Sequence, residues 1–298
     1  MFVIFGATGK AGHMTATTLR HAGLPVRAVV RNLEQAVSLK QSGCEVVQAD
    51  LTNAAAVAHA IAGAYAVQIL CPVVPADDPH ASDTMRQMIQ TAADALRRTP
   101  PAVVLGLSDF GAELPQGTGI TMLFHELEHQ LKTIPTRLTL LRSAEHLQNW
   151  ARVLPIALAT NTLPSLHAPL DHPFATVSAH DVGLAAAQLL QQEPANDQPH
   201  IVSIEGPRRV SVEDIAQTLS ELAGRPIKPY AVPRANWPAM LARGGHSADY
   251  IRLMSDLYDT HNAGGIDVET GAGEHWHGQT TLRMVLGALL ARATVPAP

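Results

Sequence analysis

Residues 1–12 read MFVIFGATGKAG, and this stretch decides the fold. Its four apolar residues, Phe2 to Phe5, are typical of a short buried strand in a parallel sheet. The strand runs directly into a loop with glycines at positions 6, 9 and 12, and a helical pattern follows the loop. This order of strand, glycine loop and helix is the setting in which such a loop binds the diphosphate of a dinucleotide.

Each glycine of the G-x-x-G-x-x-G loop has its own purpose. Gly6 permits the tight turn, Gly9 lets backbone N–H groups approach the diphosphate, and Gly12 lets the helix pack closely on the strand. The free N–H groups and the partial positive charge at the helix N-terminus also favour an anion. We therefore predict that the whole loop binds the cofactor, namely Gly6, Ala7, Thr8, Gly9, Lys10, Ala11 and Gly12.

The composition is typical of an α/β enzyme with a sizeable core, because 46% of the 298 residues are hydrophobic and 16% are charged. A net charge of −5 gives no sign of a nucleic-acid or anionic membrane partner. The two cysteines, Cys44 and Cys71, form no C-x-x-C motif and indicate a reducing compartment. The apolar N-terminus is too short for a signal peptide and no transmembrane run is present, so we expect a cytoplasmic protein.

Strand and helix patterns alternate through about residue 142. We expect strands at 2–5, 26–30, 45–48, 65–70, 102–107 and 137–141, with helices after Gly12 and at 33–41, 53–62, 80–98 and 119–132. Repeated βα units predict an α/β fold of the Rossmann type, a doubly wound parallel sheet with helices on both faces. Ligands of such sheets bind outside the carboxyl ends of the strands.

The pattern loosens beyond residue 142, where prolines punctuate the chain. Further helices are expected at 179–191, 211–222 and 282–290, and strands at 201–204 and 227–232. We expect residues 1–150 to form the NAD(P)-binding domain, with a returning segment near 175–205. Residues 151–298 are expected to form a smaller α/β substrate-binding lobe.

Two strand ends indicate the adenosine side of the cofactor. Arg31 follows the second strand, where NAD-binding proteins usually carry a carboxylate for the ribose 2′-OH, and an arginine suits the 2′-phosphate of NADP instead. Asp50 ends the third strand, where it would accept a hydrogen bond from the adenine amino group while Leu51 packs on the ring. A solvated surface arginine and a turn aspartate are the alternatives.

Two more strand ends point to the nicotinamide side. The fourth strand ends in Leu70, Cys71 and Pro72, which we expect beside the nicotinamide, with a plain connecting loop as the alternative. The stretch directly after the fifth strand contains Ser108 and Phe110. Ser108 would face the nicotinamide and hold a substrate oxygen, although a structural turn serine is an equal alternative; Phe110 is expected to contact the substrate.

These motifs together resemble the NmrA-like group of atypical short-chain dehydrogenase/reductases. The resemblance rests on Gly6-Ala7-Thr8-Gly9, Val30-Arg31-Asn32, Ala49-Asp50-Leu51, Thr139 to Arg142, His180 to Gly183 and the stretch from Gly206 to Ala216. The match is strongest through residue 230 and weak around 235–280. Within the group it is closest to NAD(P)H-dependent quinone reductases, judged from the Arg31-Asn32 turn and from Arg142 with Asn149 downstream.

The resemblance implies hydride transfer from NADPH to a quinone or a similar small flat electrophile, with Asn149 among the substrate contacts. NADPH is the expected cofactor, preferred over NADH. Other members of the group bind the dinucleotide without turnover and act as redox-sensing regulators, so a regulatory NADP sensor is the alternative. The expected partner is a small-molecule electron acceptor, with no nucleic acid and no membrane, and a homodimer or a regulatory protein partner stays open.

One departure from ordinary short-chain dehydrogenases bears on the chemistry. Those enzymes use Tyr-x-x-x-Lys, and none of the four tyrosines here has a lysine four residues later. Alcohol or ketone chemistry by that route is therefore not expected. His129 occupies about the place of the family's helix lysine, so His129 and Ser108 are the predicted catalytic residues, His129 orienting the ribose or donating a proton. A solvent-facing helix histidine is the alternative.

Two histidine patterns compete with this interpretation. Residues 125–129 read HELEH and match the zinc motif H-E-x-x-H, which would indicate a zinc hydrolase. The apolar stripe of this helix explains the same string without a metal. His275 and His277 alternate in a late segment and could bind a metal or border the pocket. We expect neither pattern to be a metal site.

Overall fold

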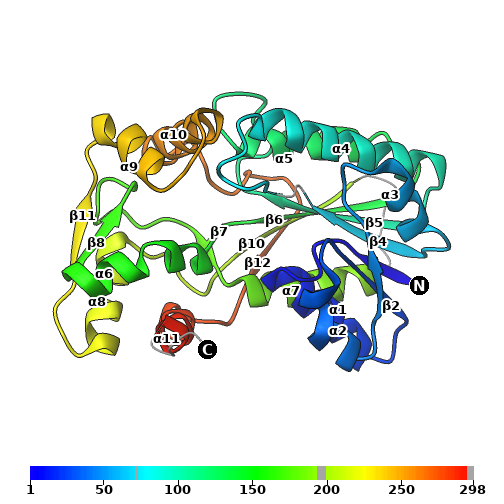
Figure 1. Cartoon of the computed structure of the whole chain (residues 1–298), viewed down its shortest axis with the longest axis horizontal. Coiled ribbons are helices and arrows are strands. Elements are labelled where there is room, and N and C mark those ends of the chain that lie inside the picture. Colours follow the sequence, from blue (N-terminus) through cyan, green and yellow to red (C-terminus); the bar gives the residue numbers. More distant parts are fainter. Residues whose placement is uncertain (71–72, 193–198, 294–298) are drawn as a thin grey trace.

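Eight parallel strands form the central sheet in the computed structural model of this chain (Figure 1). The structure describes residues 1–70, 73–192 and 199–293. The strand order is β12-β10-β6-β5-β4-β1-β2-β3. Their bounds are β1 Phe2–Ile4, β2 Val26–Val30, β3 Glu45–Gln48, β4 Ala66–Leu70, β5 Val103–Asp109, β6 Arg137–Ser143, β10 His200–Glu205 and β12 Glu274–His277.

Helices cover both faces of this sheet, which explains why its strands are apolar without alternation. Along β1, Val3 contributes to the core on one face while Phe2 and Ile4 contribute to the core on the other. The first face is covered by α3 Ala54–Ile61, α4 Ala81–Arg98 and α5 Thr121–Leu131, and the second by α1 Lys10–His21, α2 Val37–Gln41 after the 3₁₀ turn η1 Leu33–Ala36, and α7 Ala179–Gln191 (Figure 1).

The order of connections places the crevice of the sheet beside β1. Strand β1 pairs with β2 on one side and with β4 on the other. The chain therefore first extends the sheet on one side of β1 and then returns to extend it on the other side. Ligands of doubly wound sheets bind at such a reversal. On the β4 side, β5 and β6 continue the sheet in a register that opposes Asp109 to Ser143. The carboxyl ends of β1, β4, β5 and β6 therefore open on one region.

A smaller part of the molecule has its own core, built around Leu163, Ile215 and Leu286. Its elements are β7 Glu145–His146, η2 Leu147–Arg152, α6 Leu154–Thr160, β8 Thr162–Ser165, β9 Thr176–Val177, α8 Val212–Ala223, β11 Lys228–Ala231, η3 Arg234–Asn236, α9 Trp237–Arg243, α10 Ala248–Asn262 and α11 Leu282–Ala293. Strands β8 and β11 pair in parallel. Helix α10 contributes Tyr250 and Leu253 to the core of the main sheet, so it joins the two parts.

The Rossmann-type sheet predicted from the sequence is confirmed. The eighth strand, β12, was not expected, and it extends the sheet at its far edge. The returning segment contributes α7 and β10 to the main layers. We keep the division into residues 1–150 and 151–298 as a proposal. Among the described residues, none of the helices combines the length and the apolar character needed to span a bilayer.

Candidate active site

One large cavity, of about 620 Å³, lies at the carboxyl ends of the central strands and reaches from the glycine loop to α10. A cavity of this size can hold the nicotinamide half of a dinucleotide together with a small acceptor. Its walls are Phe5, Gly6, Thr8–Gly12, Gln68, Leu70, Val73, Leu107–Phe110, Ile120, Thr121, Phe124, Ser143–His146, Gln148, Asn149, Arg152, Ala175, Ala179, Val182, Tyr250, Met254, Leu257, Tyr258, His261 and Ile266.

The backbone of the glycine loop closes one end of the cavity. Gly6 has a φ of +68°, a backbone angle that residues other than glycine rarely adopt. A Cβ on Gly12 would lie 2.3 Å from the Gly6 carbonyl oxygen, so the helix can approach the loop this closely only with glycine there. Gly9 is the N-cap of α1, and no side chain satisfies the first N–H groups of this helix. The helix therefore offers free N–H donors to an anion in the cavity.

The charges near this loop also fit a phosphate. Burial lowers the pKa of Lys10, and the two charged groups that lower it further are both cationic, Arg292 and Arg152. Lys10 and Arg152 line the cavity, so two positive side chains meet there at the N-terminus of α1. An anionic ligand would relieve their mutual repulsion.

Gln68 adds an unsatisfied acceptor to the same wall. It lies on β4 with no exposed surface, and its Oε1 has no hydrogen-bond partner among the described residues. Buried polar atoms are normally satisfied, so an orphan that lines a cavity indicates a missing ligand group. The glycine cradle, the two cations and this acceptor together fit a dinucleotide.

Ser108 lines the middle of the cavity but its hydroxyl is already used. Its Oγ donates to Oε1 of Glu128 at 2.7 Å, and Glu128 also accepts from Nε and Nη2 of Arg142, both at 2.7 Å. All three side chains are buried. In this arrangement Ser108 can only accept a hydrogen bond from a ligand. Its predicted catalytic role stays a prediction, limited by this geometry to accepting.

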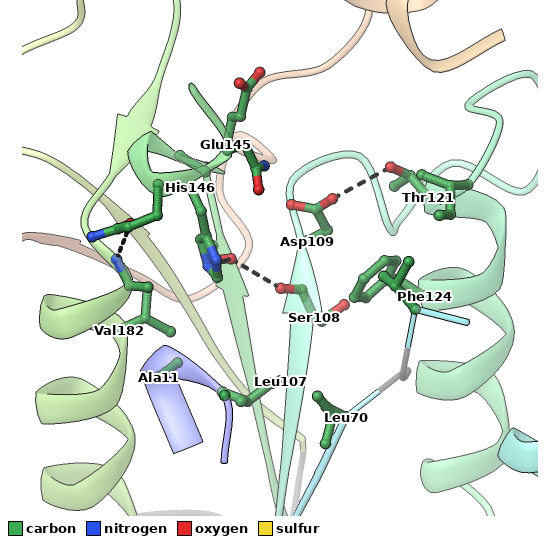
Figure 2. A pocket seen from close by; sticks show the side chains of 18 of the residues that line it. Ala11, Leu70, Leu107, Ser108, Asp109, Thr121, Phe124, Glu145, His146 and Val182 are labelled. Atoms are coloured by element: carbon green, nitrogen blue, oxygen red, sulfur yellow. Dashed lines mark hydrogen bonds between the residues drawn. The ribbon is translucent and has the colours of Figure 1, made fainter. Parts of the chain in front are cut away.

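Two carboxylate side chains, Asp109 and Glu145, line the far end of the cavity (Figure 2). Asp109 ends β5, and Glu145 follows the neighbouring strand β6. Burial and the Glu145 carboxylate raise the pKa of Asp109 to about 7. Thr121 of α5 is its one side-chain hydrogen-bond partner in the described part of the chain, through a long contact of 3.5 Å. The Asp109 carboxyl therefore gains or loses its proton close to neutral pH while it lines the cavity.

Glu145 is the ionised member of this pair. Burial opposes its ionisation, but His167, which contacts its Oε2 at 2.9 Å, holds its pKa below the usual value. The two carboxylates therefore have different protonation states near neutral pH. A pair of titratable groups whose surroundings separate their pKa values is typical of sites that move protons.

Burial keeps three further titratable side chains of the cavity wall neutral, namely His146, Tyr258 and His261. Burial lowers the pKa of His146 to about 4 and that of His261 also to about 4. Burial and the Glu145 charge raise the pKa of the Tyr258 phenol. A tyrosinate is thereby disfavoured, which agrees with the missing Tyr-x-x-x-Lys motif.

The structure brings most of the predicted site residues to this cavity. These are Gly6, Thr8, Gly9, Lys10, Ala11, Gly12, Leu70, Ser108, Phe110 and Asn149. Ala7, Arg31, Asp50 and Leu51 do not line it, and Cys71 and Pro72 lie outside the described residues. Ala7 is fully buried in the core.

The adenosine-side residues lie at the ends of β2 and β3. Arg31 is exposed directly after β2. Oδ1 of Asp50 accepts from the backbone N–H of Thr52 at 2.8 Å and from its hydroxyl at 2.7 Å, as in a turn aspartate, and Leu51 packs in the core. Their contacts with the adenosine stay predictions.

The structure does not bring His129 to the cavity, which corrects its expected place beside the reacting groups. His129 is exposed, whereas its neighbour Glu128 is 1% exposed. Neighbouring residues point in different directions on a helix, and the ion pair of Glu128 with Arg142 fixes the rotation of α5. That pairing turns His129 outward.

The two histidines of the H-E-x-x-H string do not belong to a group of three possible metal ligands among the described residues. His125 contacts the Ala112 carbonyl oxygen through Nδ1 at 2.8 Å, and Glu126 pairs with Arg86 of α4 at 3.3 Å. The leucines of the same helix pack in the core with α4.

Sequence reasoning missed Gln68, Asp109, Glu145, Tyr258 and His261. For the first three a signal existed: Gln68 is a polar residue inside an apolar strand, and the two carboxylates stand at or just beyond strand ends. To find Tyr258 and His261 from the sequence, helix α10 had to be recognised first. Its signal is the N-cap Ser247, which precedes buried residues at helical spacing.

Comparison with known proteins agrees with this geometry. A family model described as NAD(P)H-binding matches residues 6–193. The chain is 25% identical over 259 residues to the NAD(P)H azoreductase of Xenophilus azovorans, covering 87% of this chain and 86% of the relative. It is 24% identical over 286 residues to quinone oxidoreductase 2 of Escherichia coli, covering 95% and 96%.

Solved structures share the fold. The Citrobacter sp. triphenylmethane reductase complexed with NADP(H) superimposes with a TM-score of 0.78 at 18% identity, covering 97% of this chain and 100% of that one. NmrA, a negative transcriptional regulator, superimposes with a TM-score of 0.67 at 16% identity, covering 87% and 83%.

Proposed function

The chain belongs to the NAD(P)H-binding family, and on that premise we propose that it is an NADPH-dependent reductase of quinones or similar small flat electrophiles. Its relatives in Xenophilus azovorans and Escherichia coli are named as an NAD(P)H azoreductase and a quinone oxidoreductase. Quinones and azo compounds are both flat and conjugated, and both accept two electrons, so the shared chemistry supports this substrate class.

The observation that carries the proposal is the continuity of one cavity from the glycine loop to a far end whose walls combine apolar side chains with Asp109 and Glu145. The loop, Lys10, Arg152 and Gln68 would hold the dinucleotide, which supplies a hydride when bound. Beyond them the walls include Phe110, Phe124 and other apolar side chains that suit a flat ring. A protein that only sensed the cofactor would not need the part of the cavity that lies beyond the cofactor-binding residues.

Asp109 is the proposed proton donor in this reaction. An acceptor that gains a hydride, which carries both electrons of the reduction, also requires a proton on its oxygen or nitrogen. The Asp109 carboxyl, which keeps its proton because burial and Glu145 raise its pKa, would give this proton to the acceptor and regain one from solvent. Glu145 cannot take this role near neutrality, since its pKa is lowered.

The alternative is a dinucleotide-sensing regulator with a protein partner. It agrees with the likeness of the fold to NmrA. A homodimer is a further proposal on the partner side. The regulator and the reductase differ in one measurable property, which is turnover.

Steady-state oxidation of NADPH with a panel of quinones, azo compounds and secondary alcohols tests the proposal. We expect turnover with the first two classes and none with alcohols.

Gly9→Val should abolish dinucleotide binding, because the valine side chain would enter the cradle. A Cβ at position 9 would lie only 3.1 Å from the Gly6 carbonyl oxygen. Gly287→Ala on α11, where a Cβ meets no atom within 4 Å, is the control.

The outcomes separate the two functions. Tight NADPH binding without turnover on any acceptor would favour the regulator. Unchanged NADPH binding by Gly9→Val, measured by calorimetry, would remove the basis of both.

A further inference from the structure

The far edge of the central sheet carries two histidines that the reductase proposal does not use. They lie on β12, the outermost strand, at alternate positions, and side chains at alternate positions share one face of a strand. Trp276 between them packs against the core on the α1 and α7 side. In the register with β10, Glu205 is opposite His277 and Ser203 is opposite His275. Glu205 therefore shares the face of both histidines.

We propose that Glu205, His275 and His277 form a binding site for a divalent transition metal, with zinc as the best match. One ligand atom from each of the three residues lies within 4.8 Å of the others, and in residues 1–70, 73–192 and 199–293 this is the one group of three such side chains. In a tetrahedral zinc site the ligand atoms are about 3.4 Å apart, since the bonds are roughly 2.0–2.1 Å long. Small rotations of the two exposed imidazoles would close the difference.

The backbone around His277 already orients its ring for this purpose. Nδ1 of His277 lies 3.2 Å from the Gly206 carbonyl oxygen, and a carbonyl can only accept, so Nδ1 carries the proton. Nε2 is then left with a free lone pair. A metal-binding histidine commonly donates its other ring N–H to a carbonyl in this way.

The two strand ends are also fixed to each other. The Gly278 N–H donates to the Glu205 carbonyl oxygen at 2.7 Å, and the Gly206 N–H donates to the Thr176 carbonyl oxygen at 2.6 Å. The scaffold that carries the three side chains is thus held before any ion binds, which lowers the cost of assembling the site.

The local charge favours a cation. Glu205 is 4% exposed; its Oε1 lies 3.0 Å from Nε2 of His275, and its Oε2 accepts from Nε of Arg209 at 3.0 Å. Arg209 is shared with Asp267, so two carboxylates face one guanidinium and the set carries a net charge of −1 while the histidines are neutral. The alternative is a plain pair of His275 with Glu205 and no metal. The two arrangements differ in whether a metal binds and in whether His277 contributes.

Titration of the untagged chain with Zn²⁺ by calorimetry, and with Co²⁺ by visible absorption, tests the site. We expect one equivalent to bind near neutral pH, with the absorption bands of tetrahedral cobalt. His275→Ala and His277→Ala should each lower the affinity at least about tenfold. His200→Ala is the control, because His200 joins the same two strands through its 2.7 Å contact with Glu274 but lies outside the group. Its metal affinity should equal that of the wild type.

Either of two results would overturn the site: no saturable binding by the wild type, or binding that is unchanged in either of the two histidine variants. Both substitutions are at exposed positions of the edge strand, so unaltered circular dichroism should show that the fold is kept. Metal binding is measured here without NADPH or an acceptor, so its outcome is independent of the reductase proposal.

Discussion

At the scale of single residues, Asp109 connects the structure to a pH dependence. Its carboxyl is protonated below about pH 7, so turnover should fall as the pH rises through that value. Asp109→Asn keeps the shape but has no proton to give, and we expect roughly a hundredfold lower kcat, the lower end of general acid catalysis. The falling limb of the pH profile should disappear with it. A profile of kcat against pH for both proteins measures this.

Glu145 provides the matched variant for this test. Its negative charge helps to raise the Asp109 pKa, so Glu145→Gln should move the falling limb to lower pH while leaving turnover at acidic pH. If the falling limb stays in place in both variants, it belongs to the titration of another group.

The raised pKa of Asp109 also affects the stability of the fold. Because the folded-state value is raised, the stability that it contributes is lost as the pH rises from roughly 4 to 7, and Asp109→Asn should remove this loss.

Arg31 is the residue on which the choice of cofactor depends. A guanidinium pairs with the 2′-phosphate of NADPH, and a charge-assisted contact of this kind contributes roughly 1.5–3 kcal/mol. We predict that NADPH binds about ten- to a hundredfold more tightly than NADH and that Arg31→Asp reverses the order. Titrations of both proteins with both cofactors provide the measurement. Equal wild-type affinities would show that exposed Arg31 contacts only solvent.

Sequence reasoning reached some residues of the site and missed others for a physical reason. The glycine loop could be found because a local backbone requirement fixes both the residue type and the spacing. His129 was misplaced because nothing local distinguishes it from Glu128. Which of the two faces inward depends on Arg142, which lies 14 residues beyond Glu128 on another element. Partners of this kind are visible only in the folded chain.

At the scale of elements, one buried ion pair fastens α5 to β6. The Arg142 guanidinium donates twice to Glu128 and also contacts Glu113 and Glu269. Arg142→Met would leave the buried Glu128 carboxylate with Lys132, at 3.3 Å, as its one remaining cation among the described residues, so we expect a loss of about 3 kcal/mol in the free energy of unfolding. Adding Glu128→Leu removes this poorly compensated charge and should restore part of the loss. Urea unfolding of the single and double variants measures both effects.

A surface pair on the same helix is the control for that prediction. Arg86 pairs with Glu126 of α5, and their side chains are 44% and 35% exposed. Exposed pairs contribute about 1 kcal/mol or less, so Arg86→Met should change stability little. If Arg142→Met cost no more than Arg86→Met, the buried pair would not be what positions α5.

Elements with strong local signals were predicted to within a residue or two. Strands β2 and β3 have the expected bounds, and α8 begins with the expected box between Ser211 and Asp214. Helix α6 was missed because Pro155 suggested a loop, although proline is tolerated in the first helical turn where it stands here. Strand β12 is short, polar and paired on one side, so its pattern resembles that of a loop.

At the scale of the whole molecule, the cavity depends on both parts of the chain. The glycine loop belongs to the main sheet, whereas Arg152 and Tyr258 come from η2 and α10. The cofactor would contact elements far apart in the sequence, which explains why the sequence could indicate the glycine loop but not the opposite wall. Binding should then stabilise the molecule as a whole.

The size of that stabilisation can be predicted from the cofactor preference. At a concentration about 100 times its Kd, NADPH should add about 2.7 kcal/mol to the free energy of unfolding, which corresponds to roughly 5 °C in Tm for a chain of this size. NADH at the same concentration, if about ten- to a hundredfold weaker, should add only about 0.4–1.4 kcal/mol. Gly9→Val should show neither shift, and Arg152→Ala should show a smaller NADPH shift because one of the two cations lining the cavity is removed. Thermal unfolding of the three proteins with each cofactor is the measurement. An NADPH shift in Gly9→Val equal to that of the wild type would mean that the cofactor binds outside the glycine loop.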